Sequence, residues 1–313
     1  MLDTSVFKKL ARNDTGAAAG HQGGIVVPKD IAAFFPPLPS VIPGGNPTVD
    51  KILKAELFVD GRRVGVVETR YQHQTWGGTR SAERRLTGNL GPLRNLANAD
   101  DILLFTKDLL DDNFIQLNLI RRGTPEYAFL SDRIGASRWG PVDRENPPVS
   151  LQEIQDAEAN LEQEIAGEPV VFGPPREEAE MKSMRKARDR AFRKKVLRQY
   201  DFRCAFTGRK FVSPHSPETV GLDAAHVVPV YVNGSDHPAN GLPLTKELHW
   251  AFDRGLIGVS ANRLIVVPNA VAMLPGNEFL RDLNGLVIRE AEENRLRVSD
   301  EALGWHRDNV LMA

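Results

Sequence analysis

Hydrophobic and polar residues alternate with a period of two along much of the first half of the chain. Residues 55–72, AELFVDGRRVGVVETRYQ, contain two β-branched runs that meet at an Asp-Gly pair, which is typical of a two-residue hairpin turn. Residues 101–123 hold two further apolar runs, and residues 24–27 form a short one. Short strands at this spacing, separated by turn residues, predict a barrel-like β domain over residues 1–148.

Helical patterns occur at the start of this region and after its end. Residues 3–13 favour a short helix. Residues 151–166 have helical spacing between a Ser150 N-cap and a Gly167 stop, inside a linker predicted over residues 149–184. This second helix carries acidic residues and neither Lys nor Arg, so we expect it to pack on a basic surface or to face solvent, not DNA.

The most basic stretch of the chain comes next, where residues 176–200 predict a long helix. Counted along the sequence, residues 176–198 hold ten Lys or Arg and four Asp or Glu, with three of the four acidic ones near the start, as the helix dipole favours. Such a helix is either a solvated face or a source of phosphate contacts, which add affinity but carry no sequence information. We favour phosphate contacts, with Arg188, Arg193 and Lys194 as candidates.

Residues 222–255 combine three kinds of local pattern. Residues 222–232, LDAAHVVPVYV, predict a strand, and NGSDHPANG after it has the composition of a turn-rich loop. TKELHWAFDRG then has helical spacing, with Thr245 as N-cap and Gly255 as C-terminal stop. A hairpin over LIGVSANRLIVVP follows this helix.

This stretch contains polar residues whose side chains could take part in catalysis or metal binding. His226 lies within the apolar strand, Asn240 lies at the loop exit, and His249 and Asp253 share one helix face because they are four residues apart. A face with such residues can hold a hard divalent cation, and an imidazole opposite it can take a proton from water, which suits phosphodiester hydrolysis. Taken singly, each residue is more often a packed core histidine or a solvated pair; it is their order that favours a site.

The order His226, Asn240, His249 resembles the HNH (ββα-metal) endonuclease family. The segments YDFRCAFTGRKF, LDAAHVVPV and NGLPLTKELHWAFDRGLIGVS are similar to its restriction-type branch, over residues 185–313 taken as the nuclease domain. The resemblance implies that His226 is the general base, that Asn240 holds the loop and the base in place, and that His249 is a metal ligand. It also implies Mg²⁺, Mn²⁺ or another divalent cation as cofactor.

The residue before the catalytic histidine departs from the family pattern. That residue is often an acidic or histidine metal ligand in the family, whereas this chain has Ala225. Asp223 shares a strand face with Ala225 and is a candidate for the role, while Asp253 is a candidate second ligand. Many relatives also carry zinc knuckles, but Cys204 is the one cysteine in the chain, so a four-thiolate zinc is excluded and no structural zinc is expected.

A second cluster of polar residues lies between the two predicted hairpins, in YQHQTWGGTRSAERRLTGNLGPL. Arginine forks read guanine edges, and a glutamate accepts from a cytosine amine. On its own such a loop is more often a solvated face. The candidate DNA contacts here are Tyr71, His73, Trp76, Arg80, Glu83, Arg84 and Arg85.

The first half of the chain resembles the EcoRII N-terminal family of restriction effector domains. The similar motifs are NDTGA and GHQ near the start, then GTR and ERRLT, where this chain has Gly78 in place of a lysine. The resemblance implies a pseudobarrel that clamps duplex DNA in the major groove. It implies base readers at Arg80, Glu83 and Arg85. It also implies a second arm that is formed or braced by Arg12, Asn13, His21 and Gln22.

Composition bounds the class of protein without identifying it. The 313 residues are 41% hydrophobic and 26% charged, as in an ordinary globular protein with two domains, and the net charge of −1 does not by itself indicate a nucleic-acid partner. One cysteine allows no intrachain disulfide, and no apolar run is long enough to span a membrane. We therefore expect a cytoplasmic protein with no membrane partner.

Together these patterns predict an α+β chain with an N-terminal β-pseudobarrel, a helical connector and a C-terminal ββα-metal nuclease domain. The predicted function is a restriction endonuclease that cuts double-stranded DNA, as a homodimer because one HNH site cuts one strand. One alternative is a nuclease that requires methylcytosine or phosphorothioate in its target, read by a pocket around Tyr71, His73, Trp76 and Gly77. Another is a DNA-binding regulator with a decayed nuclease domain, and an RNA target is disfavoured because no aromatic stacking platform is evident.

Overall fold

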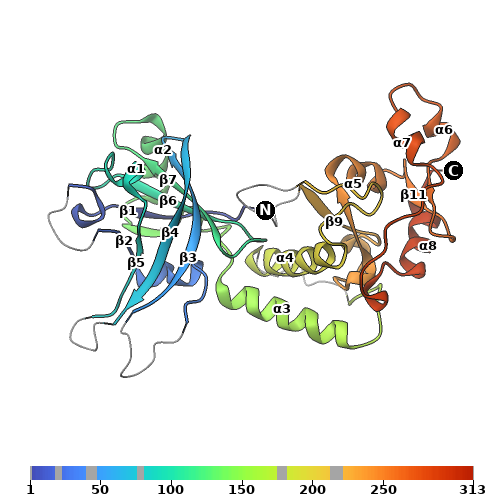
Figure 1. The fold of residues 1–313 in the computed structure, drawn as a ribbon, viewed down its shortest axis with the longest axis horizontal. Helices are drawn as coiled ribbons and strands as arrows, with labels where there is room; N and C mark the ends of the chain where they lie inside the picture. Colours follow the sequence, from blue (N-terminus) through green and yellow to red (C-terminus); the bar gives the residue numbers. More distant parts are fainter. Residues whose placement is uncertain are drawn as a thin grey trace. The chain divides into compact units, whose positions relative to one another are not determined.

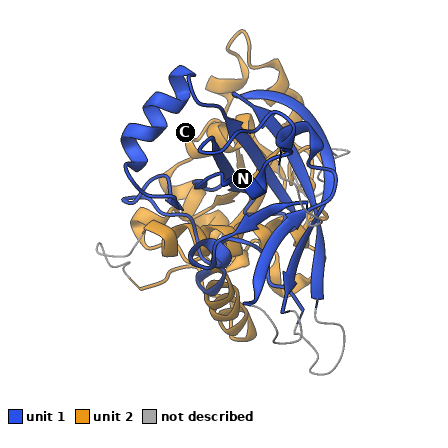
Figure 2. Cartoon of the chain, turned by 90° about the vertical axis from the view of Figure 1, so that its left-hand side faces the viewer, with its two compact units in different colours: residues 1–153 blue, residues 154–313 orange. Residues whose placement is uncertain are grey.

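The chain divides into two compact units in a computed structural model. Unit 1 comprises Met1–Glu153 and unit 2 comprises Ile154–Ala313 (Figures 1 and 2). The structure describes residues 2–17, 23–39, 48–75, 81–174, 182–211 and 221–312. The division falls inside the predicted linker over residues 149–184, near the start of its helix, and the predicted domain limits stay predictions.

Unit 1 is built on one mixed sheet that curls into a half-barrel. Its strands are β1 (Val6–Lys9), β2 (Ile25–Val27), β3 (Thr48–Val59), β4 (Arg62–Gln74), β5 (Glu83–Thr87), β6 (Ile102–Lys107), β7 (Phe114–Ile120) and β8 (Trp139–Pro141). Their order is β2-β5-β4-β3-β7-β6-β1-β8, with β3 and β7 parallel and the other neighbours antiparallel. The helical pieces are η1 (Arg12–Asp14), η2 (Lys29–Phe34), α1 (Gly91–Arg94) and α2 (Pro125–Ile134).

The hairpin predicted at the Asp-Gly pair is confirmed as β3 and β4. Asp60 and Gly61 both have positive φ, 47° and 75°, the backbone that a twisted two-residue turn requires. The inner face of the curled sheet encloses an apolar core, and α2 packs Leu130 and Ile134 against Phe7 on the outer face. The predicted barrel-like β domain is thus present as a half-barrel.

The helix predicted over residues 3–13 is wrong. Val6–Lys9 is instead a strand that pairs with β6 on one side and β8 on the other, so its backbone hydrogen bonds come from residues far along the chain. The following turn is held by a buried ion pair: Lys8 Nζ lies 2.7 Å from Asp14 Oδ2, and the two side chains are 7% and 0% exposed. Asp14 also accepts hydrogen bonds from the backbone N–H groups of Ala11 and Val26, which ties the turn to β2.

Unit 2 is a small αβ unit whose two long helices lie side by side (Figure 1). Its elements, with α3 starting at the boundary, are α3 (Leu151–Ala166), α4 (Lys182–Gln199), β9 (Leu222–His226), η4 (Val230–Val232), η5 (Pro238–Asn240), β10 (Gly241–Thr245), α5 (Lys246–Asp253), β11 (Gly258–Val259), β12 (Ile265–Val266), α6 (Asn269–Ala272), α7 (Glu278–Leu283), η6 (Asn294–Leu296) and α8 (Asp300–Asn309).

The predicted limits of α3 are confirmed. The Ser150 hydroxyl accepts from the Glu153 N–H at 3.2 Å, and Glu153 accepts from the Ser150 N–H at 2.7 Å, a reciprocal cap. The acidic face of α3 packs on a basic surface, as anticipated: Glu158 pairs with Arg190 and Lys194, and Glu162 pairs with Lys195. The α4 helix begins at Lys182 in the described structure, and residues 175–181 lie outside it.

The ββα pattern is formed by β9, β10 and α5. Only Leu222–His226 of the predicted longer strand is extended, and it pairs with Gly241–Thr245, a strand that the sequence pattern did not indicate. The helix α5 ends where predicted, with Gly255 at φ 70°. The hairpin expected after it is the β11–β12 pair.

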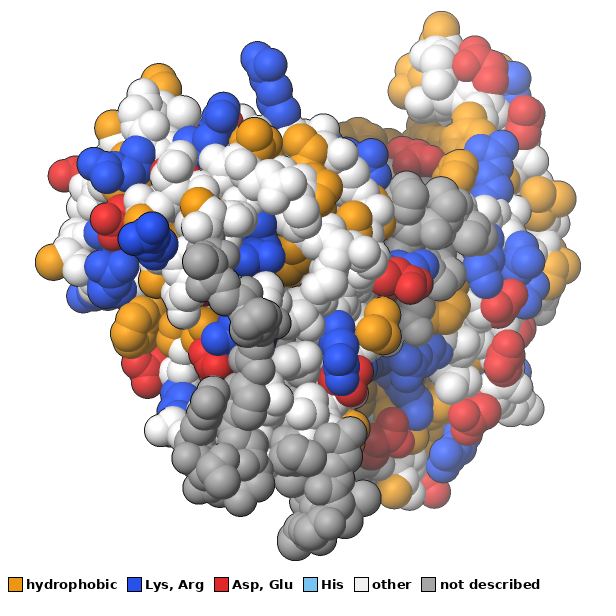
Figure 3. Space-filling view, turned by 60° about the vertical axis from the view of Figure 1, so that its left-hand side comes forward, with side chains coloured by type: hydrophobic (Ala, Val, Ile, Leu, Met, Phe, Trp, Pro, Cys, Tyr) orange, Lys and Arg blue, Asp and Glu red, His pale blue; other side chains and the backbone are white. Residues whose placement is uncertain are grey.

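Charged side chains of both signs are interspersed over the face shown in Figure 3, in keeping with the net charge of −1. The fold class predicted from sequence, an α+β chain with a curled β domain and a ββα nuclease unit, is confirmed. Among the described helices, none is both long and apolar enough to cross a lipid bilayer.

Candidate active site

A cavity of about 350 Å³ in unit 2 brings together most of the residues that the sequence singled out. Its lining includes His226 from the end of β9 and both His249 and Asp253 from α5. His306, which no sequence pattern pointed to, lines the same cavity from α8. Three elements that are distant in sequence therefore converge on one space.

His226 is held from two sides. Its Nε2 lies 2.9 Å from Oδ1 of Asp236, and the two side chains are 17% and 15% exposed. Its ring stacks on the ring of Phe192 from α4, with centroids 3.9 Å apart and planes inclined by 14°. In the sequence, Asp236 stands in a turn-rich stretch with no further signal, so this partner of the predicted base was not predicted.

The stacking depends on a glycine in β10. Gly241 lies directly opposite His226 in the β9–β10 pair. A Cβ on Gly241 would stand 2.6 Å from Cγ2 of Val196 and 2.8 Å from Cζ of Phe192, closer than such atoms can approach. The missing side chain lets α4 approach the strands, which brings the Phe192 ring against the imidazole.

Asn240 is fully buried and bonds only to backbone groups among its described contacts. Its Oδ1 accepts from the Val228 N–H at 2.8 Å, and its Nδ2 donates to the carbonyl oxygens of Val228 and Ser235, each at 3.0 Å. These bonds close the loop between β9 and β10, the loop that carries Asp236. Asn240 therefore stabilises this loop. A direct role for Asn240 in catalysis stays a prediction.

His249 lies between two carboxylates. Its Nδ1 is 3.5 Å from Oδ2 of Asp223, and its Nε2 is 3.5 Å from Oδ2 of Asp253. The contact with Asp223 raises the pKa of His249 and lowers the pKa of Asp223, whereas burial raises the pKa of Asp253. Asp223 does not line the cavity, and its Oδ1 is bonded to Arg193 at 2.9 Å, so it stands behind His249.

The donor set allows a simple test of whether a divalent cation fits. Within the described residues, no group of three or more His, Cys, Asp or Glu side chains is arranged to hold a metal ion. Mg²⁺ commonly uses only one or two protein groups, and completes its shell with water and substrate phosphate. The His249 and Asp253 pair on the cavity wall meets that lesser requirement. Asp223, which contacts His249 from outside the cavity lining, would orient that ligand, and its own part as a metal ligand stays a prediction.

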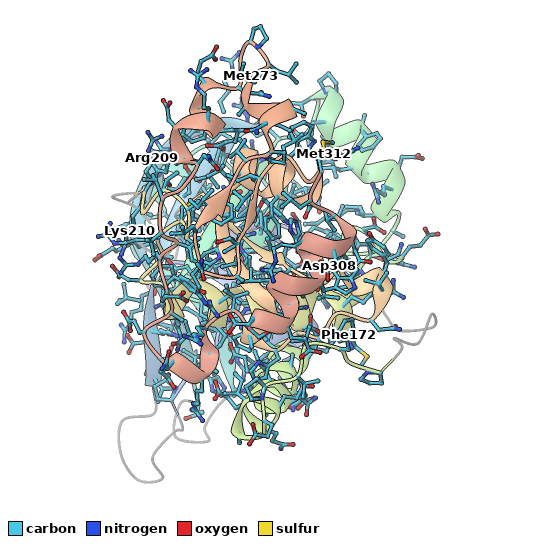
Figure 4. All side chains as sticks on the ribbon, turned by 90° about the vertical axis from the view of Figure 1, so that its right-hand side faces the viewer. Phe172, Arg209, Lys210, Met273, Asp308 and Met312 are labelled. Carbon is cyan, nitrogen blue, oxygen red and sulfur yellow. The ribbon has the colours of Figure 1, made fainter. Side chains whose placement is uncertain are left out.

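His306 fastens the end of α5. Its Nε2 donates to the Phe252 carbonyl at 2.9 Å, its ring stacks on Phe252 at 3.7 Å, and its buried Nδ1 has no hydrogen-bond partner among the described residues. Burial lowers the pKa of His306 to about 4, so the imidazole is neutral near pH 7. The chain continues past Asp308 to Met312 (Figure 4). The N–H of Met312 donates to the Gly255 carbonyl at 3.0 Å, which ties the C-terminal segment to the turn after α5.

The basic residues predicted to contact phosphates are engaged inside unit 2. Arg193 bonds to Asp223 and to the Leu222 carbonyl, and Lys194 pairs with Glu158 at 3.3 Å. Their side chains are 19% and 15% exposed. Both cations thus have intramolecular partners in the described structure, and their contacts with phosphates stay a prediction. Arg188, at 35% exposure, lies 3.9 Å from Asp236.

One predicted DNA contact in unit 1 is wrong. Tyr71 is 1% exposed and stacks on Phe35, with centroids 5.0 Å apart, inside the half-barrel core. Burial raises its pKa to about 12. The alternation of side chains along the strand already predicts that Tyr71 points inward. The polar residues on both sides of it suggested an exposed position instead. A pocket for a modified base therefore cannot be built around this side chain.

The other described candidates of unit 1 lie on or beside two strands. Glu83 and Arg85 are partly exposed and pair with each other, Nε to Oε2, at 2.9 Å. Both act electrostatically on Lys8, so the β5 pair lies near the turn that carries Arg12 and Asn13, which are exposed. The described residues of the two predicted arms thus lie on neighbouring parts of unit 1, and their contacts with DNA stay predictions.

His73 and Arg84 are cross-strand partners at the end of β4 and β5. Burial, aided by Arg84, lowers the pKa of His73. His21, Gln22, Trp76 and Arg80 were also predicted to contact DNA, and they lie outside the described residues. Their roles stay predictions.

Comparison with known families agrees with the sequence motifs. Residues 204–260 match the family model described as HNH endonuclease, and residues 2–120 match the model described as restriction endonuclease EcoRII, N-terminal. The first match spans β9, β10 and α5, and the second spans the half-barrel through β7. Both resemblances stated from the motifs are confirmed. No curated protein sequence matches the chain.

Two solved structures show weak overall likeness. One is described as a modification-dependent TagI restriction endonuclease, with 20% identity, a TM-score of 0.27, and coverage of 38% of this chain and 37% of that chain. The other is the N-terminal domain of Helicobacter pylori LlaJI.R1, with 18% identity, a TM-score of 0.29, and coverage of 44% of this chain and 98% of that chain. The likeness to the first thus spans well under half of that protein.

Proposed function

Since the chain joins a domain of the EcoRII N-terminal family to an HNH endonuclease domain, we propose that it is a restriction endonuclease that binds double-stranded DNA through unit 1 and hydrolyses it with unit 2. The observation that carries the proposal is the cavity shared by His226, His249 and Asp253. An imidazole and a cation-binding pair on one cavity wall are the groups that phosphodiester hydrolysis needs.

In this mechanism His226 accepts a proton from the water that attacks the phosphorus. The imidazole can do so because it is only partly buried, reaches the cavity, and is fixed by its ring stacking. His249 and Asp253 would hold the divalent cation. When bound, that cation would supply positive charge for the phosphate and leaving oxygens. Asn240 would keep the loop after β9 closed while the phosphate is in place.

Unit 1 would supply the DNA site. Glu83 and Arg85, with Arg12 and Asn13 near them, present hydrogen-bonding groups of both kinds on one region of the half-barrel. Because one HNH site cuts one strand, a double-strand break would need two copies of the chain on the DNA. Sedimentation of the chain with and without a cognate duplex would show whether the second copy arrives before or with the DNA.

Plasmid cleavage tests the proposal directly. We would incubate the chain with Mg²⁺ or Mn²⁺ and three matched plasmids: unmodified, cytosine-methylated and phosphorothioated. We expect discrete fragments from the unmodified plasmid, and cutting of a modified plasmid alone would make the enzyme modification-dependent. Binding without cutting on any plasmid would point to a regulator with an inactive nuclease unit.

His226→Ala separates binding from cutting. Loss of the general base should lower the cleavage rate by about 10²–10⁴-fold, whereas duplex affinity measured by gel shift should stay within twofold of wild type, roughly the assay error. Asn309→Ala, an exposed change on α8 in the same unit, is the control. Equal loss of both activities in His226→Ala would refute the division of labour between the units.

A further inference from the structure

The two histidines of the site are supported in the same way. His226 contacts the carboxylate of Asp236 at 2.9 Å, and His249 contacts that of Asp223 at 3.5 Å. Behind each carboxylate stands an arginine of α4: Arg188 lies 3.9 Å from Asp236, and Arg193 lies 2.9 Å from Asp223. The result is two chains of arginine, aspartate and histidine that start on one helix.

A third side chain of α4 completes the support. Phe192, four residues after Arg188 and one before Arg193, is the residue whose ring stacks on His226. It is 1% exposed and fits against β10 only because Gly241 lacks a side chain. All of α4 lies before residue 204, outside the segment that matches the HNH family model.

Building on the proposed function, we infer that α4 is a positioning helix for catalysis, in which Asp236 with Arg188 orients His226, and Asp223 with Arg193 orients His249. Two of the basic residues of α4 thereby gain a role inside unit 2. Neither aspartate touches the phosphate; each acts through the histidine that it contacts.

The chemistry of imidazole gives each contact a specific effect. A neutral imidazole has one N–H and one lone pair, and a carboxylate can only accept. Asp236 therefore keeps the proton of His226 on Nε2 and leaves the lone pair on Nδ1, the atom that must accept a proton from water. Once that proton is transferred, the same carboxylate stabilises the imidazolium. Asp223 likewise keeps the proton of His249 on Nδ1 and leaves Nε2, on the Asp253 side, as the lone pair for a cation.

Asparagine substitutions distinguish the two Arg–Asp–His series, because one should impair turnover and the other metal binding. Asp236→Asn preserves shape but offers an N–H to Nε2, so His226 loses its preferred tautomer. We expect kcat to fall by about 10–100-fold, with KM for DNA and the Mn²⁺ affinity within twofold, about the assay error. Asp223→Asn should instead weaken Mn²⁺ binding by about tenfold, with kcat largely restored at saturating Mn²⁺. Asp308→Asn removes the same charge from an exposed site on α8 and should change neither quantity (Figure 4).

A readout that does not depend on cleavage shows the tautomer directly. In histidine-¹⁵N-labelled protein, the His226 ring signals are assigned by their loss in His226→Ala. The wild type should show Nε2 protonated and Nδ1 bare near neutral pH, and Asp236→Asn should move the population toward the other tautomer. Arg188→Lys should preserve the wild-type pattern more closely than Arg188→Gln, because the lysine keeps a cation near Asp236.

The outcomes separate this inference from the proposed function. If the wild type cuts no plasmid, the proposed function fails, while the ring spectra still report the positioning. If the wild type cuts DNA and Asp236→Asn cuts it equally well with an unchanged ring spectrum, the inference is overturned. Identical defects in Asp236→Asn and Asp223→Asn, or a lower melting temperature for both that accounts for the loss, would also overturn it.

Discussion

The buried charged residues of the two units have different structural roles. In unit 1, the Lys8–Asp14 pair is almost wholly buried and bonds to backbone groups, so it shapes the turn that displays Arg12 and Asn13 to solvent. In unit 2, Asp236 and Asp223 bond to the reactive imidazoles themselves. The candidate DNA contacts of unit 1 are thus exposed side chains on a buried frame, whereas the candidate catalytic side chains of unit 2 are each fixed by a partner of their own.

The difference follows from what each site must do. Under the proposed function, base readers gain their partners only when DNA arrives, so before binding they can remain exposed or pair with each other, as the candidates Glu83 and Arg85 do. Reactive groups must already be within a fraction of an ångström of their working positions, because misplacement lowers the rate steeply. A buried network that reaches the reacting side chain is therefore expected in unit 2 and not in unit 1.

Disruption of the buried Lys8–Asp14 pair in unit 1 should give the largest effect on stability. Asp14→Asn leaves the Lys8 ammonium buried without its counter-ion, which should lower the free energy of unfolding of unit 1 by about 3–5 kcal/mol. Urea denaturation gives the total loss, and hydrogen exchange shows which unit opens. Lys8→Met combined with Asp14→Leu removes both charges and should recover much of the loss. Faster exchange in unit 2 peptides would contradict the assignment of this pair to a local frame.

Acid should loosen unit 2 through His306, with a smaller effect. The pKa of this imidazole is about 4 in the folded chain against 6.5 for a free histidine, so between these values the unfolded state binds a proton that the folded state does not. Stability contributed by the neutral ring is present above pH 6.5 and falls as the pH drops towards 4, by at most about 3 kcal/mol.

Denaturant titrations of wild type and His306→Gln at several pH values measure this loss. The substitution should flatten the dependence between pH 6.5 and 4, at some cost in stability at pH 7 because the Phe252 carbonyl loses its present donor. His73→Gln in unit 1 is the matched histidine control and should leave the unit 2 slope unchanged. An unaltered slope in His306→Gln would show that other groups govern the acid response.

The smallest effect is expected for DNA binding by the partly exposed candidate contacts of unit 1. Arg85→Ala should weaken binding to a cognate duplex by about 1–3 kcal/mol, because a bidentate arginine contact to a base has that worth. The folded stability should change little, because the Glu83–Arg85 pair is partly exposed. Arg62→Ala, an exposed arginine at the β3–β4 turn, serves as control in the same gel-shift titration. An equal loss in both variants would mean that Arg85 contributes charge without base recognition.

Local features were determined by the sequence alone. The Asp-Gly turn of the long hairpin, the caps of α3 and the stop of α5 each depend on a few neighbouring residues, and all were predicted at the observed positions. The order of His226, Asn240 and His249 indicated the nuclease family for a related reason, since a ββα unit is compact and its motif residues are close in sequence.

Non-local features were decided by the tertiary structure. Residues 6–9 became a strand because β6 and β8 offered partners on both sides, against a local pattern that favoured a helix. Tyr71 entered the core through its packing on Phe35, and the basic side chains of α4 turned to Glu158, Asp223 and Asp236. No pattern in the sequence encodes such pairings, because the energy of a charge or a ring depends on which distant group is brought beside it. For that reason candidate reactive residues could be named from the sequence, while the residues that contact them in the folded chain could not.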